Sequence, residues 1–191
     1  MTIGIFCSAN DNIDRTYFDL TAELGRWCAR QGHTIVFGGC NVGLMECVAR
    51  AAKEAGGRTV GIIPMLVERH GRAFDDMDVH IPCDDLNDRK ALMMARSDVF
   101  IALPGGIGTL DEVFTVAASA SIGYHCKRVI LYNMNGFWDS LIAVLNDLTN
   151  KGMIRGDIHR HICTADSSKR LPDCSNPEVK RADDRHRPPA F

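Results

Sequence analysis

Short apolar runs recur along the chain, and polar or glycine-rich segments separate them. Runs of this length are typical of strands, and those that are apolar throughout are typical of strands buried on both faces of a sheet. Most of them are followed by Gly, Pro or Asn, which favour a turn. The predicted strands are Thr2–Cys7, Thr34–Gly38, Thr59–Ile63, Val99–Leu103 and Arg128–Tyr132.

Helical periodicity occupies the segments between these runs. It is clearest over Asp14–Gln31, where Leu24, Trp27 and Cys28 fall largely on one side. Strands that alternate with helices predict a parallel sheet covered by helices. The predicted fold class is therefore α/β: a doubly wound, Rossmann-like, mostly parallel sheet with helices on both faces. Such sheets bind ligands beyond the carboxyl ends of their strands, so the strand-to-helix turns are where a site is expected.

The length of 191 residues is enough for one sizeable core, which we expect in a single domain over residues 1–162. Residues 163–191 form a polar tail that holds four of the seven prolines and almost no aliphatic residues. Because such a composition cannot offset its ordering entropy by burial, we expect this tail to be disordered or draped on the surface, and dispensable for the fold.

Charge and composition exclude several classes of partner. The formal net charge is −2, without the broad basic field that nucleic-acid binders use, so no nucleic-acid partner is expected. No apolar run approaches the roughly 20 residues of a membrane span, and the expected location is the cytoplasm. The eight cysteines are scattered without a CxxC pair, which favours reduced thiols over a disulfide framework or a metal site. No metal is expected.

The most informative turn is the sequence PGGIGT, which follows the apolar run Val99–Leu103 and precedes a helical pattern. Glycines at 105, 106 and 108 leave backbone N–H groups uncovered, and a helix N-terminus adds partial positive charge. Gly105, Gly106, Gly108 and Thr109 are therefore candidates for binding a phosphate. An alternative is that the glycines only form a tight turn, with Thr109 and Glu112 as a helix capping box.

Two further turns carry polar or glycine-rich sequence. One contains Ser8 in the sequence CSAN, and the other contains Gly39 in the sequence GGCNVGLME. The glycine spacing of the second is G-G-x-x-x-G, which is only loosely similar to a dinucleotide-binding fingerprint. Because the turns follow strands of one parallel sheet, Ser8 and Gly39 are candidates for the same phosphate-binding crevice.

A predicted helix over residues 84–96 carries Arg89, Lys90 and Met93. Arg89 and Lys90 are candidates for contact with an anionic group of a substrate. Met93 is a candidate for stacking against the same ligand. An alternative is a solvated cationic face with the methionine in the core.

These elements together resemble the LOG family, the cytokinin riboside 5′-monophosphate phosphoribohydrolases that were long labelled lysine decarboxylases. The sequence PGGIGTLDE is similar to the PGGxGTxxE motif of that family, and Asp88-Arg89-Lys90 is similar to the ERK element before it. GGCNVGLME resembles the GGGxxGLMG turn, with Cys40 and Glu46 in place of two glycines, and Val60–Pro64 resembles the VIGIIP strand. The resemblance extends from about residue 3 to residue 154.

The resemblance implies hydrolysis of the N-glycosidic bond of a purine or cytokinin-type nucleoside 5′-monophosphate such as AMP, which releases free base and ribose 5-phosphate. Glu112 would stabilise positive charge on the ribose, and Arg89 would contact the ribose, the phosphate or the departing base. This chemistry needs no cofactor. A homodimer is also implied, with the helix after PGGIGT near its interface.

Two other activities are alternatives. A lysine decarboxylase would need pyridoxal phosphate on a lysine, and Lys90 is the only lysine near the motifs. A nucleotide or pterin-cofactor carrier would use the phosphate-binding turn without chemistry. Because a carrier needs no carboxylate beside the sugar, Arg89 and Glu112 together favour the hydrolase.

Overall fold

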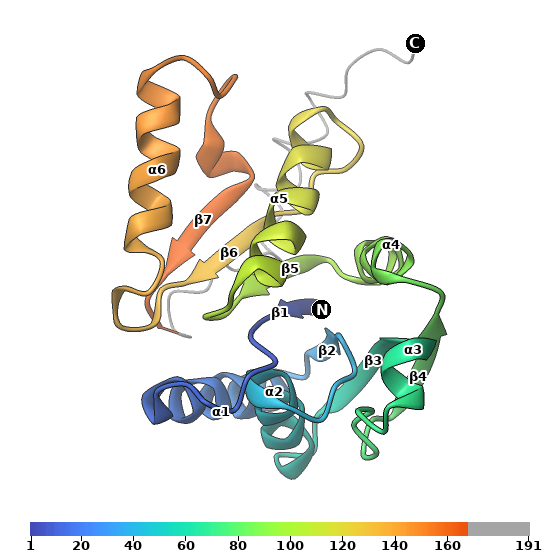
Figure 1. Cartoon of the computed structure of the whole chain (residues 1–191). Coiled ribbons are helices and arrows are strands. Elements are labelled where there is room, and N and C mark those ends of the chain that lie inside the picture. The colour runs from blue at the N-terminus through green and yellow to red at the C-terminus, as the bar shows by residue number, and fades with distance from the viewer. Residues whose placement is uncertain (168–191) are drawn as a thin grey trace.

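The computed structural model describes residues 1–167, which form a parallel sheet in the strand order β4-β3-β2-β1-β5-β6-β7 (Figure 1). Every neighbouring pair of strands is parallel. The strands are β1 (Thr2–Phe6), β2 (Thr34–Phe37), β3 (Arg58–Pro64), β4 (Val79–Cys83), β5 (Val99–Ala102), β6 (Val129–Tyr132) and β7 (Ile162–Ala165).

Helices cover both faces of the sheet, so the predicted doubly wound α/β fold is confirmed (Figure 1). Alternate residues of each strand point to opposite faces. Ile3 and Ile5 pack toward α1 and α2, whereas Phe6 packs toward α4, α5 and α6. The helices are α1 (Arg15–Arg30), α2 (Gly43–Glu54), α3 (Met65–Arg69), α4 (Leu86–Arg96), α5 (Ile107–Ser121) and α6 (Asp139–Asn150), with short 3₁₀ turns η1 (Met134–Gly136) and η2 (Ile158–Arg160).

The chain first adds strands on one side of β1, as far as β4, and then crosses to add β5 on the other side. The turns after β1 and β5 therefore leave the sheet side by side and in opposite directions. Backbone bonds join them: the Leu103 N–H donates to the Phe6 carbonyl (2.9 Å), and the Ser8 N–H donates to the Pro104 carbonyl (3.0 Å). Such a switch point is where an open α/β sheet offers a binding crevice.

Two strands lie outside the sequence prediction. Strand β4 alternates partly buried and exposed positions before the buried Cys83 and lies at one edge of the sheet, so it lacks a continuous apolar signal. Strand β7 lies at the other edge and pairs with β6. It continues through Ala165, so the sheet extends three residues past the predicted domain boundary at residue 162. Residues 168–191 of the predicted tail lie outside the described residues, and its dispensability stays a prediction.

Candidate functional site

A cavity of about 370 Å³ opens at the switch point, beyond the carboxyl ends of β1, β2 and β5. It collects side chains and backbone from the three turns singled out in the sequence and from α4. Its lining residues are Cys7, Ser8, Ala9, Asn10, Cys40, Met45, Arg89, Gly106, Gly108, Thr109 and Glu112.

The PGGIGT turn presents an open helix N-terminus to this cavity. Helix α5 begins at Ile107, and its N-cap residue, Gly106, supplies no side-chain cap. A Cβ added at Gly106 or Gly108 would meet no atom within 4 Å. The first N–H groups of α5 are therefore uncovered by side chains, which is the arrangement that binds a phosphate at a helix N-terminus.

The alternative prediction of a capping box at this turn is wrong. Helix α5 begins two residues before Thr109, so Thr109 lies inside the first turn and is buried. Gly105 packs against it, since a Cβ at Gly105 would lie 2.1 Å from the Thr109 hydroxyl oxygen. Gly105 is thus needed for close packing of the turn, and it does not line the cavity itself.

The second glycine-rich turn has its helix N-terminus already occupied. The Gly43 N–H donates to the Asp11 carboxylate (2.7 Å), and the Leu44 N–H donates to the Ser8 carbonyl (3.0 Å). A phosphate there would have to displace a carboxylate. Gly39 has a positive φ of 73°, and a Cβ added there would lie 3.0 Å from the Ile63 side chain. A glycine is therefore required for the conformation and packing of this turn. Gly39 does not line the cavity. Of the two turns, PGGIGT is the better phosphate site.

A buried ion pair forms part of the cavity wall. The Arg89 guanidinium on α4 donates to the Glu112 carboxylate on α5 (2.5 Å), and the two side chains are 12% and 6% exposed. Burial raises the pKa of Glu112 to about 7, although the Arg89 charge acts in the opposite direction. Arg89 also keeps a buried Nε–H without an acceptor in the described residues. A substrate oxygen could supply that acceptor.

Two candidates from the same helix lie away from the cavity. The Lys90 ammonium donates to the Asp111 carboxylate (2.7 Å), parallel to the Arg89–Glu112 pair, and it is not in the lining. Met93 is fully buried in the core between the sheet and α4–α6. In this structure Met93 contacts core side chains, as the alternative interpretation of the helix expected.

Sequence reasoning did not assign Asn10, Cys40 or Met45, which also line the cavity. All three lie in or directly after turns that the sequence had singled out, so their position after β1 and β2 was the available signal. Burial raises the pKa of the Cys40 thiol, which keeps it a neutral, weakly polar wall.

Residues 1–167 contain neither a candidate metal site nor a candidate membrane-spanning helix. No group of three or more His, Cys, Asp or Glu side chains comes together there in a way that could hold a metal ion. None of the helices described combines the length and apolarity that crossing a membrane requires.

Comparisons with known proteins show which family the chain is similar to. The family described as "Possible lysine decarboxylase" matches residues 45–173. A cytokinin riboside 5′-monophosphate phosphoribohydrolase of Mycobacterium tuberculosis is 37% identical over 168 residues, which cover 88% of this chain and 89% of that protein. A probable enzyme of the same name from rice, Oryza sativa subsp. japonica, is 34% identical over 172 residues, 88% of this chain and 80% of the relative.

Among solved structures, the molybdenum cofactor binding protein of Rippkaea orientalis superposes with a TM-score of 0.64 at 24% identity, covering 95% of each chain. At that identity the likeness shows a shared fold only.

Proposed function

Because the chain belongs to the LOG family, the cytokinin riboside 5′-monophosphate phosphoribohydrolases, we propose that it hydrolyses the N-glycosidic bond of a nucleoside 5′-monophosphate. The products are free base and ribose 5-phosphate. The observation that carries this proposal is the buried Arg89–Glu112 pair, which shares one cavity with an open phosphate-binding turn.

The substrate phosphate binds at the N-terminus of α5, where Gly106 and Gly108 leave the backbone N–H groups open. Ser8 and Asn10 line the same cavity and can donate further hydrogen bonds. Glu112 lies little more than one helical turn further along α5, so a ribose attached to that phosphate comes to lie beside its carboxylate.

Cleavage develops positive charge on the ribose ring, and the ionised Glu112 carboxylate stabilises that charge. The bond from C1′ to the base nitrogen breaks, and its electron pair leaves with the base. Water adds to C1′ through its oxygen and gives a proton to Glu112, while the base gains a proton from solvent. Arg89 keeps Glu112 ionised and offers its free Nε–H to a ribose oxygen.

A carrier without chemistry is the rival proposal, and the chain shares its fold with a molybdenum cofactor binding protein. A carrier has no use for a buried carboxylate beside the sugar, because an ionisable group there costs desolvation energy. The Arg89–Glu112 pair therefore favours the hydrolase.

Decarboxylation, named in the description of the family, is not supported by the lysine positions. Pyridoxal-phosphate chemistry needs a lysine in the cavity. The lining of the described cavity holds none, and Lys90 is paired with Asp111 outside it. The proposed hydrolysis uses water, Glu112 and Arg89, and it calls for no cofactor.

The proposed assembly is a homodimer through the outer face of α5. Ile107 and Phe114 on this helix are 83% and 41% exposed, Ile122 directly after it is 68% exposed, and Leu86 on α4 is 55% exposed. Exposed apolar side chains gathered on adjoining elements are typical of an interaction surface. Gly108 and Glu112 of the same helix line the cavity, so a second copy docked on α5 would lie near the site.

The proposed location is the cytoplasm. Five cysteines within residues 1–167 are free thiols, as in proteins kept under reducing conditions: Cys7, Cys28, Cys40, Cys47 and Cys83.

Phosphate recognition is tested by comparing AMP with adenosine. We expect kcat/KM for AMP to exceed that for adenosine by roughly 10² or more, because binding of the phosphate positions the ribose. Gly106→Leu places a side chain in the open space of the turn and should raise the Kd for AMP while leaving the melting temperature nearly unchanged. Gly105→Ala is the matched control, since it clashes with Thr109 and should instead lower the melting temperature. Equal kcat/KM for AMP and adenosine would contradict the assignment.

The pH dependence of turnover follows from the raised pKa of Glu112. Below about pH 7 the carboxyl is protonated and cannot stabilise positive charge, so kcat/KM for AMP, which reports the pKa of the free enzyme, should fall on the acid side and level off above about pH 8. The substrate phosphate titrates at about pH 6, so the points between about pH 6.5 and 8 carry the comparison. A flat profile between pH 5.5 and 8 would exclude ionised Glu112 as the required form.

A further inference from the structure

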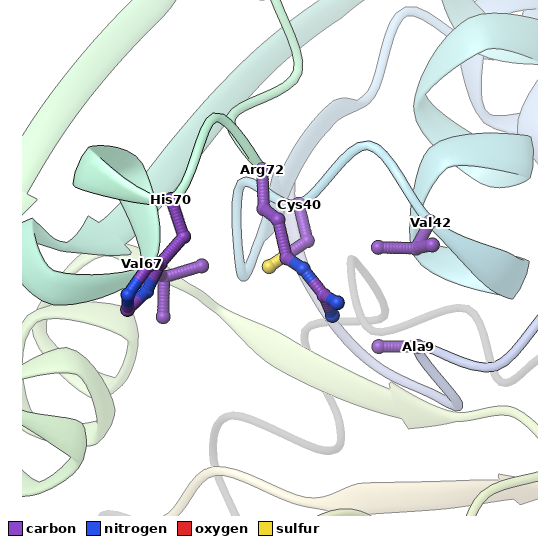
Figure 2. A pocket seen from close by; sticks show the side chains of 6 residues that line it. All are labelled: Ala9, Cys40, Val42, Val67, His70 and Arg72. Atoms are coloured by element: carbon purple, nitrogen blue, oxygen red, sulfur yellow. The ribbon is translucent and has the colours of Figure 1, made fainter.

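The cavity in Figure 2 adjoins the site already described. It has a volume of about 480 Å³ and shares Ala9 and Cys40 with the first cavity, so it forms one region with the proposed nucleotide site. A separate cavity of about 340 Å³ lies at the opposite end of the sheet, where β1, β2, β3 and β4 begin. None of the roles proposed for Arg89, Glu112 and the PGGIGT turn uses this space.

The first residues of four neighbouring strands line this amino-end cavity. Thr2 begins β1 and is paired in register with Thr34, which begins β2. Thr34 is paired in turn with Arg58, which begins β3, and Val79 begins β4. Because the PGGIGT turn follows the carboxyl end of β5, the amino-end cavity lies a full strand length away from it. The remaining lining residues are Val36, Val60, Ile81 and Arg96.

The floor of the amino-end cavity is apolar and incompletely covered. Val36 on β2 and Val60 on β3 are paired in register, and both point to the face of the sheet on which α4 packs. Strand β3 lies inside the sheet between β2 and β4, yet Val60 is only partly buried. Ile81 on β4 is also partly buried on this face. Side chains of neighbouring strands thus form an apolar surface that the helices leave partly open.

Two arginines at the rim have no carboxylate partner within residues 1–167. Arg58 at the start of β3 and Arg96 at the end of α4 are both exposed, and they line the same cavity. Neither takes part in a salt bridge there, whereas Arg89 and Lys90 on α4 are each paired. The Arg96 guanidinium makes only a long hydrogen bond, to the Leu92 carbonyl (3.5 Å). The donors of both side chains are therefore available to a ligand.

The carboxylates next to these segments are already engaged. Asp98 accepts from the Thr2 N–H (2.7 Å). Asp78 accepts from the Lys53 ammonium (2.6 Å) and from the Thr59 N–H (2.7 Å). The rim of the amino-end cavity therefore keeps an excess of cationic donors, which favours an anionic ligand.

A buried hydroxyl beside the floor also lacks a hydrogen-bond partner. Ser97 is 2% exposed, and its Oγ is unpaired within the described residues. A Cβ added at Gly4 would lie 2.8 Å from this oxygen, and Gly4 is paired in register with Val36 of the floor. A bound ligand or water commonly satisfies a buried polar group of this kind.

We infer that the amino-end cavity binds a small organic anion, a phosphate or carboxylate group carried by a single apolar ring. Arg58 from the sheet and Arg96 from α4 bind the anionic group, and the hydroxyls of Thr2 and Thr34 add donors. The ring lies on the floor around Val60. A volume of about 340 Å³ is near the lower end for small-molecule sites, which suits one ring better than a whole nucleotide. This site takes no part in the proposed hydrolysis.

The test uses phenyl phosphate and benzoate as probes in titration calorimetry. Ribose 5-phosphate is present at saturation, so that the phosphate-binding turn of the first cavity is occupied. We expect the wild type to bind one molecule of probe per chain under these conditions. Absence of binding by both probes would overturn the inference.

Variants of Arg58 locate the bound probe. Arg58→Ala should weaken probe binding about tenfold, because it removes a charged donor, and Arg58→Lys should weaken it only about threefold, because the charge remains. The matched control is Arg30→Ala, which removes an exposed arginine from the end of α1 that does not line the cavity. Equal Kd values for Arg58→Ala and Arg30→Ala would contradict the assignment.

The role of the floor is tested with Val60→Thr, which keeps the β-branched shape of the side chain and adds a hydroxyl. This variant should weaken binding of phenyl phosphate about threefold and leave binding of inorganic phosphate unchanged, because inorganic phosphate has no ring to place on the floor. Equal losses for the two ligands would exclude the apolar contact. None of these measurements depends on turnover, so the amino-end cavity is decided separately from the proposed hydrolysis.

Discussion

Replacing Glu112 by Gln is expected to lower kcat for AMP hydrolysis by roughly 10² or more, while the Kd for AMP changes little. Gln keeps the shape of the side chain, and its amide oxygen can still accept from Arg89, which lies 2.5 Å away in the wild type. The substitution removes the negative charge that the developing positive charge on the ribose requires. The loss should therefore appear in the chemical step and not in binding.

The matched control for Glu112→Gln is Asp111→Asn. Asp111 is the preceding residue and pairs with Lys90, but it does not line the cavity. Asp111→Asn should leave kcat within about twofold of the wild type. Melting temperatures of both variants report whether the fold is retained. Undiminished turnover by Glu112→Gln would show that this carboxylate has no part in the reaction.

Replacing Arg89 by Ala is expected to reduce turnover to near background, a loss of roughly 10² to 10³ in kcat. Burial already raises the pKa of Glu112 to about 7 against the opposing charge of Arg89. Without that charge the pKa of Glu112 rises further, so the carboxyl is protonated at neutral pH. The ribose also loses its contact with the guanidinium.

The pH profile separates these two consequences of Arg89→Ala. If loss of ionised Glu112 contributes, residual kcat of the variant should continue to rise with pH above 8, where the wild-type profile is level. Arg96→Ala is the control, because Arg96 lies on the same helix but donates to the Leu92 carbonyl and does not line the cavity that holds Glu112. A profile that rose no further in Arg89→Ala than in the wild type would mean that Arg89 acts only by direct contact.

The central strands and the helices beside the site could be predicted from the sequence because their signals are local and strong. Strands β1, β2, β3 and β5 are short apolar runs, and α1 begins after Asp14, whose side chain accepts from the Thr16 N–H (2.9 Å) as an N-cap. The edge strands β4 and β7 gave no such signal, because an edge strand is covered less completely and tolerates polar positions and proline.

The site could be predicted only in part, because spacing does not say which donors stay free. The two glycine-rich turns look alike in sequence, and the structure separates them through Asp11, which occupies one helix N-terminus. The pattern Thr109-x-x-Glu112 is typical of a helix capping box and fits a catalytic site equally well. The structure separates the two, because α5 begins at Ile107, before Thr109.

The measurement that tests the central claim most directly is the identification of products after the purified wild-type chain is incubated with AMP and a panel of other ribonucleoside and deoxyribonucleoside monophosphates. Chromatography of the base and an independent assay of ribose 5-phosphate should find the two products of the wild type in equal amounts. The Glu112→Gln variant should form only a small fraction of that ribose 5-phosphate. Binding of AMP without release of free base from any monophosphate would contradict the account and assign the PGGIGT turn to a carrier.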